Sequence, residues 1–347
     1  MRIAIALLAT CGALAAQPRD TYRVLVSTDL GGDPDDIQSL YRLVHYSDIL
    51  RVEGIVSSPG PGAENSVDKV KDWIRRIDPD YLRAKGHPEL MTEKHLLGVT
   101  VQGAFAPGAP AKDRATEGSK LIVERARAAD PDGKGRCLWV QAWGSLTDVA
   151  QALHDDPSIA KRIRIYSIGA NNTRADEASR QYILDGLQTK WPELWWIENG
   201  IYPNGSHDTF RGVYLGGDQT GEWHAAEFVK ANIRGRGSNH NGDYELISGD
   251  AFPLAGGRPG RILKEGDSPA MLYLLSPALG GPGHIDDPTR ESWGGQFRRF
   301  NIAKFPNYCV DLDVPKEDNW QTVSKWRVAF LSDWKKRWEW YGPQKPR

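Results

Sequence analysis

Four aspartates directly follow the apolar segment 22–26: Asp29, Asp33, Asp35 and Asp36 lie within eight residues of one another. Carboxylates placed so close together repel one another, and no Lys or Arg lies between them. A bound cation would remove this repulsion, and Ca²⁺ binds through carboxylate and backbone carbonyl oxygens. The segment therefore predicts a hard-cation site. The simpler alternative is a Gly-rich turn whose aspartates cap a helix.

Three familiar acidic or Gly-rich motifs do not fit this segment. An EF-hand loop that started at Asp33 would need a Glu at its twelfth position, where Val44 stands. A phosphatase that forms an aspartyl phosphate would carry a second Asp at position 31, which is Gly31. The dinucleotide fingerprint is absent, and the carboxylates would repel a pyrophosphate.

Short apolar segments alternate with helical patterns in the first two hundred residues, which favours an α/β fold with a mainly parallel open sheet. In such folds, ligands bind beyond the carboxyl ends of the strands, where the acidic segment lies. The predicted strands are 22–28, 51–58, 138–142, 163–169 and 194–199, and the predicted helices lie near 36–48, 65–77, 114–129, 145–154 and 177–190.

The remainder of the chain predicts loops and two further helices. Residues 200–265 are rich in Gly, Asn, His and aromatic residues, which is typical of long loops over a site. A helix is expected over 267–279, with Asp267 at its start. Segment 325–342 places four aromatic residues at every fourth position, which predicts a closing helix packed on the sheet, or else a partner-binding stripe. These are Trp326, Phe330, Trp334 and Trp338.

Composition and the N-terminal residues indicate the class of ligand and the location of the protein. The 347 residues include 44 Lys and Arg against 45 Asp and Glu, so no basic surface for a nucleic-acid polymer is expected. Residues 1–16 have the pattern of a signal peptide, and no other segment predicts a membrane span. We therefore expect a single domain over 20–342 in a secreted or periplasmic protein. Cys137 and Cys309 are expected to be structural, and their pairing stays open.

The segment from Asp29 to Asp36, between a Val-rich strand and a helix, resembles the signature loop of the inosine-uridine nucleoside hydrolase superfamily. The amino-acid sequence of this segment is closer to the secreted branch of the superfamily, which is sometimes described as cellulose-binding. Segments 142–153 and 265–274 are similar to two later motifs of that superfamily and occur in the same order. The resemblance covers the chain from about residue 22 to about residue 340.

The resemblance implies a calcium site and a reaction. Ca²⁺ would be held by Asp29, Asp36, Asp267 and the backbone carbonyl of Trp143, and would bind a water and two sugar hydroxyls. Asp29 would accept the proton of that water, which attacks the anomeric carbon. Asp35 would bind a sugar hydroxyl, assisted by Asn171 and Asn172 beyond the 163–169 strand. The role of Asp33 stays open.

One departure concerns the general acid, because Gly266 stands where the superfamily often has a His. Glu265 is the first candidate for that role, with His240 and His284 as alternatives. Trp196 and Trp293 are expected to stack on sugar faces.

These features predict an exported Ca²⁺-dependent hydrolase of an N- or O-glycosidic bond, acting on a nucleoside, a small glycoside or an oligosaccharide. The alternative is a carbohydrate-binding protein that keeps the calcium and sugar site without turnover. A third hypothesis treats the acidic segment as an ion-stabilised structural element. The chain could be a monomer or a homodimer.

Overall fold

The computed structural model describes residues 21–31, 33–201, 208–237, 252–254 and 262–344. Its centre is an eight-stranded sheet of order β3-β2-β1-β4-β5-β6-β8-β7. All neighbouring strands pair in parallel except β7 and β8, which form an antiparallel edge. The strands are β1 (Tyr22–Thr28), β2 (Leu50–Ser57), β3 (Thr100–Gln102), β4 (Leu138–Ala142), β5 (Ile163–Ile168), β6 (Trp195–Asn199), β7 (Phe297–Asn301) and β8 (Phe305–Asp311).

The predicted mainly parallel α/β sheet in a single domain is confirmed, and the five predicted strands match β1, β2, β4, β5 and β6. Sequence patterns missed three strands. β3 is only three residues long, and β7 is largely exposed, so neither has a strong apolar signal. β8 begins with an aromatic and a proline, and its pairing with β6 is made by chain segments far apart in sequence.

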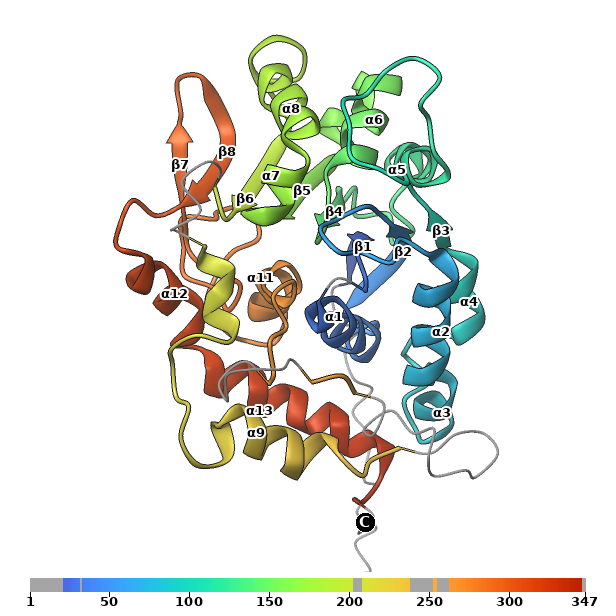
Figure 1. Cartoon of the computed structure of the whole chain (residues 1–347), viewed down its shortest axis with the longest axis vertical. Coiled ribbons are helices and arrows are strands. Elements are labelled where there is room, and N and C mark those ends of the chain that lie inside the picture. Colours follow the sequence, from blue (N-terminus) through green and yellow to red (C-terminus); the bar gives the residue numbers. More distant parts are fainter. Residues whose placement is uncertain (1–20, 32, 202–207, 238–251, 255–261, 345–347) are drawn as a thin grey trace, which may run out of the picture.

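Helices cover both faces of the sheet (Figure 1). Val24 and Val26 of β1 belong to one core cluster, which also includes residues of α1, α2, α11 and α13, whereas Leu25 belongs to a second cluster with residues of α5, α6 and α8. The α-helices are α1 (Pro34–His45), α2 (Val67–Ile77), α3 (Pro79–Ala84), α4 (Glu93–Gly98), α5 (Glu117–Arg127), α6 (Thr147–Asp155), α7 (Asn171–Ala175), α8 (Glu177–Thr189), α9 (Ala225–Phe228), α11 (Ser268–Ala278), α12 (Lys316–Ser324) and α13 (Arg327–Trp338). Shorter helical turns are η1 (Pro157–Lys161), η2 (Thr209–Val213), η3 (Gly221–Trp223), η4 (Val229–Ile233) and η7 (Glu339–Tyr341).

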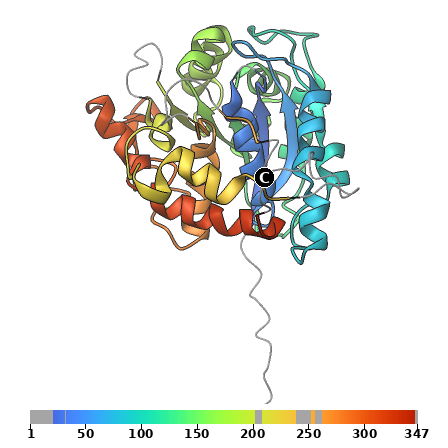
Figure 2. The ribbon, with the colours of Figure 1, turned by 60° about the horizontal axis from the view of Figure 1, so that its bottom comes forward.

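The aromatic stripe of α13 is buried, but it packs on a helix rather than directly on the sheet. The ring of Trp338 stacks on Tyr41 of α1 at 5.4 Å, and the Arg42 guanidinium lies 4.1 Å from the ring centre of Trp334. On its other side α13 lies beside the α9 segment (Figure 1, Figure 2). The predicted closing helix therefore covers α1, which in turn covers the sheet.

This arrangement brings three chain segments to the carboxyl edge of the sheet. β1 ends at Thr28, directly before Asp29, and α1 begins with Pro34 in its first turn. α11 starts at Ser268 and runs beside α1. No helix in the described part of the chain has the length and apolar character needed to cross a membrane.

Candidate metal and sugar site

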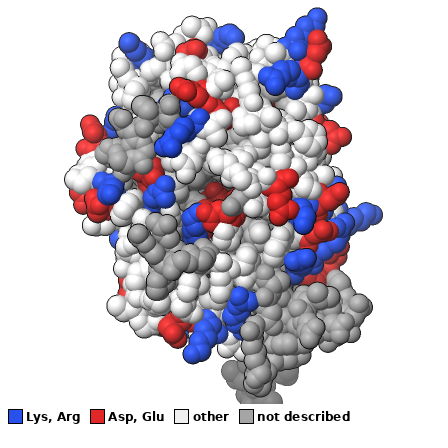
Figure 3. Space-filling model, viewed as in Figure 1, with Lys and Arg blue, Asp and Glu red and all other residues white. Residues whose placement is uncertain are grey.

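A small cavity of about 140 Å³ opens at the carboxyl edge of the sheet. Figure 3 shows acidic side chains gathered at the bottom of a hollow near the middle of this face. The cavity is lined by Asp29, Asp33, Asp35, Asp36, Pro61, Trp143, Ile168, Gly169, Ala170, Asn171, Asn172, Phe210, Arg211, Tyr214, Lys264 and Asp267. Ligand pockets for drug-sized molecules are typically several hundred Å³, so the described cavity is small.

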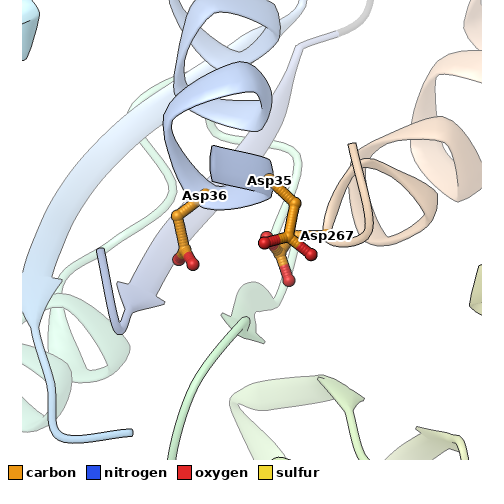
Figure 4. A group of neighbouring side chains, drawn as sticks. All are labelled: Asp35, Asp36 and Asp267. Atoms are coloured by element: carbon orange, nitrogen blue, oxygen red, sulfur yellow. The ribbon is translucent and has the colours of Figure 1, made fainter. Parts of the chain in front are cut away.

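Three carboxylates converge in this cavity although Asp267 lies more than two hundred residues from the other two. Asp35 and Asp36 point down from the first turn of α1, and Asp267 meets them from the start of α11 (Figure 4). One oxygen of each lies within 4.8 Å of the others. Three hard oxygen donors at this separation match the chemistry of a Ca²⁺ or similar hard-cation site.

The aspartates do not act as helix caps, which was the simpler explanation of the sequence. Asp33 is the N-cap residue of α1 and Asp267 that of α11, yet neither side chain makes a capping hydrogen bond. Asp36 accepts a hydrogen bond of 2.5 Å from the Thr28 hydroxyl. Oδ2 of Asp267 is buried and has no hydrogen-bond partner in the described structure. A buried carboxylate oxygen without a donor is costly, and a bound cation would satisfy it.

Asp29 lies beside this cluster, at the end of β1, and only 7% of the residue is exposed. The backbone of Gly60 approaches so closely that a Cβ at this position would overlap the Asp29 carboxylate. Any larger residue at position 60 would therefore displace the Asp29 side chain. The loop after β2 thus leaves room for Asp29 in the cavity.

Burial and mutual repulsion disfavour the charged forms of these acids. Burial raises the pKa of Asp36 to about 7, and the charge of Asp35 adds to the effect. Burial is also the main reason that the pKa values of Asp29 and Asp267 lie well above the usual range, with further increases from neighbouring aspartates. A cation among them would reverse these shifts because it stabilises the ionised forms.

Lys264 supplies a positive charge that the sequence analysis missed. Its ammonium group is ion-paired with Asp33 and lies 3.2 Å from Oδ2 of Asp35. Its position three residues before Asp267 could have drawn attention to Lys264 in the sequence. Only the fold, however, brings the segment around Lys264 next to the acidic segment 29–36. Asp33 is thereby explained as the exposed partner of this lysine rather than as a member of the buried cluster.

The opposite wall of the cavity contains the predicted carbonyl and asparagines. The carbonyl of Trp143 accepts a hydrogen bond from Nδ2 of Asn172, which also bonds the carbonyl of Ile168. Asn171 is exposed at the rim, and both asparagines belong to α7, directly beyond β5. A carbonyl oxygen has two lone pairs, so this bond leaves Trp143 able to accept a second partner.

Glu265 lies outside the cavity and has a structural partner. Both of its oxygens accept hydrogen bonds from Arg42, at 2.6 and 2.9 Å, and Ser268 donates a third. The residue is 1% exposed. The carboxylate that was the first candidate for a general acid is therefore turned toward α1. Among the histidines, His284 is exposed and does not line the cavity, and His240 lies outside the described residues.

Trp196 and Trp293 are placed in the hydrophobic core rather than at the cavity. The indole of Trp196 is fully buried and donates to Ser167, and Trp293 is 6% exposed. A buried indole cannot stack on a sugar face, so the structure corrects this expectation. Besides Trp143, the aromatic residues that line the cavity are Phe210 and Tyr214, from the η2 region, which has no strong helical or strand pattern.

The chain belongs to the family described as cellulose-binding Sde182, nucleoside hydrolase-like domain, which matches residues 23–297. A nucleoside hydrolase-related hypothetical protein from Saccharophagus degradans, described as associated with carbohydrate metabolism, has a similar solved structure. The likeness covers 94% of this chain and 73% of that one, at 21% identity and a TM-score of 0.66.

An inosine-uridine preferring nucleoside hydrolase from Bacillus anthracis is more distantly similar, at 12% identity and a TM-score of 0.45, over 88% of this chain and 99% of that one. A search of curated proteins finds no significant match. The match of the family model over residues 23–297 establishes the family and its nucleoside hydrolase-like fold.

Proposed function

We propose that this protein is an exported Ca²⁺-dependent hydrolase of an N- or O-glycosidic bond. The observation that supports this most strongly is the convergence of Asp35, Asp36 and Asp267 beside Asp29 in one small cavity. A protein that needed only a stable fold would gain nothing from burying several acids with a single lysine among them. The family, described as cellulose-binding and nucleoside hydrolase-like, supports a sugar-containing ligand.

The residues divide into metal ligands and sugar contacts. Asp29, Asp36 and Asp267 would hold the ion together with the carbonyl of Trp143, as all four line the cavity. The ion would supply positive charge that lowers the pKa of a coordinated water and orients sugar hydroxyls. Asp35 would accept a hydrogen bond from one of those hydroxyls.

The chain's own part in the reaction is proton transfer and positioning. Asp29 would accept a proton from the water as its oxygen bonds to the anomeric carbon and the bond to the leaving group breaks. Asn171 and Asn172 would hold the sugar from the α7 side. Phe210 and Tyr214 would exclude bulk water from the opposite side of the cavity.

A second candidate function is carbohydrate binding without turnover, and one observation favours it. A side chain at Gly266 would overlap Oδ2 of Asp35, so the histidine that often precedes the late aspartate would displace this carboxylate. Within the described lining no histidine replaces it. If the protein is a hydrolase, it should prefer substrates whose leaving group departs without a strong acid, such as p-nitrophenyl glycosides.

Asp29→Asn tests the proposal. We expect a loss of about 10²–10⁴-fold in kcat on the best p-nitrophenyl glycoside or nucleoside found by screening. Asp185→Asn, an exposed aspartate on α8, is the matched control and should leave kcat unchanged. Full activity of Asp29→Asn would refute its role as the base. Sugar binding without turnover in the wild-type protein would favour the second candidate.

A further inference from the structure

Lys264 divides the five acids that line the cavity into two groups. Its ammonium group contacts Asp33 and Asp35, at the outer side of the cluster. No ion pair joins Asp29, Asp36 or Asp267 to a basic side chain within the described residues. The ammonium group of Lys264 therefore lies on the outer side of the cluster, and the three buried acids have no basic side chain in direct contact within the described residues.

The position of Lys264 is fixed by its backbone rather than by its flexible side chain. Oε1 of Gln38 accepts hydrogen bonds from the backbone N–H groups of Lys264 and Glu265, at 2.7 and 2.9 Å. Nε2 of the same Gln38 donates to the carbonyl of Ile262 at 3.0 Å. The next residue, Glu265, is held by Arg42, also on α1. Helix α1 thus holds both its own aspartates and the segment that carries Lys264.

A divalent ion held by Asp36 and Asp267 would lie close to Asp35, because oxygens of these three aspartates lie within 4.8 Å of one another. Oδ2 of Asp35 also lies 3.2 Å from Nζ of Lys264, so the ion and the ammonium group would both be near this carboxylate. Two cations on one carboxylate repel each other and compete for its oxygens. The lysine is only 17% exposed, which limits the screening of this repulsion by water.

We propose that Lys264 sets the affinity of this site for divalent cations: it weakens binding and keeps Asp35 from being a full ligand, so that Asp35 remains directed at the sugar. This inference rests on the proposed function, since it assumes that the acidic cavity binds an ion. It assigns to Lys264 a role in tuning the metal site and none in the proton transfers of the reaction.

Calorimetric titration of chelator-treated protein with CaCl₂ tests this inference without any substrate. Lys264→Met should bind Ca²⁺ roughly tenfold more tightly than the wild type, because one close positive charge is removed. Lys264→Arg keeps the charge and should stay within about twofold of the wild type. Lys335→Met is the matched control, since Lys335 pairs with Glu222 and does not line the cavity. Its affinity should not change.

The possible outcomes separate this inference from the proposed function. Wild-type binding with unchanged or weaker binding by Lys264→Met overturns the role of Lys264 and leaves the proposed function standing. Binding by Lys264→Met alone supports the role of Lys264 and counts against calcium dependence of the natural protein. Absence of binding in both proteins, with circular dichroism showing that both are folded, overturns both proposals.

Discussion

Helix α1 carries two groups of buried ionisable side chains, of which one is ion-paired within the chain and the other is not. In its last turn, Arg42 forms a two-pronged ion pair with Glu265, and the two side chains are 0% and 1% exposed. At its N-terminus, Asp36 is 5% exposed and lies among other acids, with burial raising its pKa to about 7. The first group is matched within the chain, whereas the second is not.

The difference separates buried charges that stabilise the fold from buried acids that a bound cation would stabilise. A buried pair joined by two direct hydrogen bonds holds two segments in register, here α1 and the segment that leads to α11. Buried acids with few partners lower stability unless something else binds them. The Arg42–Glu265 pair positions the segment that carries Lys264 and Asp267. The ion pair therefore helps to hold the acidic cluster in place.

The largest effect is expected from breaking the matched pair. Glu265→Gln would leave the Arg42 guanidinium buried without a counter-charge, and should lower the free energy of unfolding by about 3–5 kcal/mol. Urea unfolding monitored by circular dichroism measures this. The double variant Arg42→Met with Glu265→Gln should recover part of the loss, because no unpaired buried charge remains. A loss below about 1 kcal/mol in the single variant would contradict the structural role.

The next effect concerns the unmatched acids. Saturating Ca²⁺, at about one hundred times its dissociation constant, should raise the free energy of unfolding by about 2.7 kcal/mol. Asp267→Ala should abolish this gain, while Asp185→Asn should retain it. The gain should shrink as the pH falls below about 7, because the ion must displace protons from acids with raised pKa values. Equal stabilisation at pH 5.5 and pH 8 would argue against coordination by these carboxylates.

The smallest effect has the opposite sign to the first. The folded-state pKa of Asp36 lies above its ordinary value of 3.8, so its contribution to the stability of the metal-free protein falls as the pH rises from about 4 to about 7. Asp36→Asn removes this penalty and still accepts the Thr28 hydrogen bond. In EDTA at pH 8 the variant should therefore be more stable than the wild type by at least about 1 kcal/mol, the equivalent of one pKa unit. At pH 4 the two should be nearly equal. A less stable variant at pH 8 would contradict the raised pKa.

The sequence was sufficient for the features that depend on local pattern. Alternation and apolar runs gave β1, β2, β4, β5 and β6, and the resemblance of three short segments gave the family. Asp29, Asp35, Asp36 and Asp267 were selected from spacing and resemblance, and the structure places all four in one cavity. Their assignment as metal ligands and base stays a prediction. Export of the chain also stays a prediction, since residues 1–20 lie outside the described part.

The features that sequence reasoning missed depend on contacts between distant segments. Nothing local distinguishes Glu265 as the partner of Arg42 rather than as an acid in the cavity, because they are 223 residues apart. A tryptophan such as Trp196 suits both a hydrophobic core and a sugar-binding surface, so the sequence alone does not distinguish them. Only the packing of the fold shows that Trp196 is buried.

The sequence by itself determined five of the eight strands, the family and the identity of the acidic residues, because strand periodicity and a short motif are local properties of the chain. Only the tertiary structure decided which charges are compensated. Lys264 reaches the acidic loop because Gln38 and Arg42 on α1 bind the segment that carries it. Coulomb energies depend on distance in space rather than in sequence, so the balance of charge in the cavity appears only when the segments are packed.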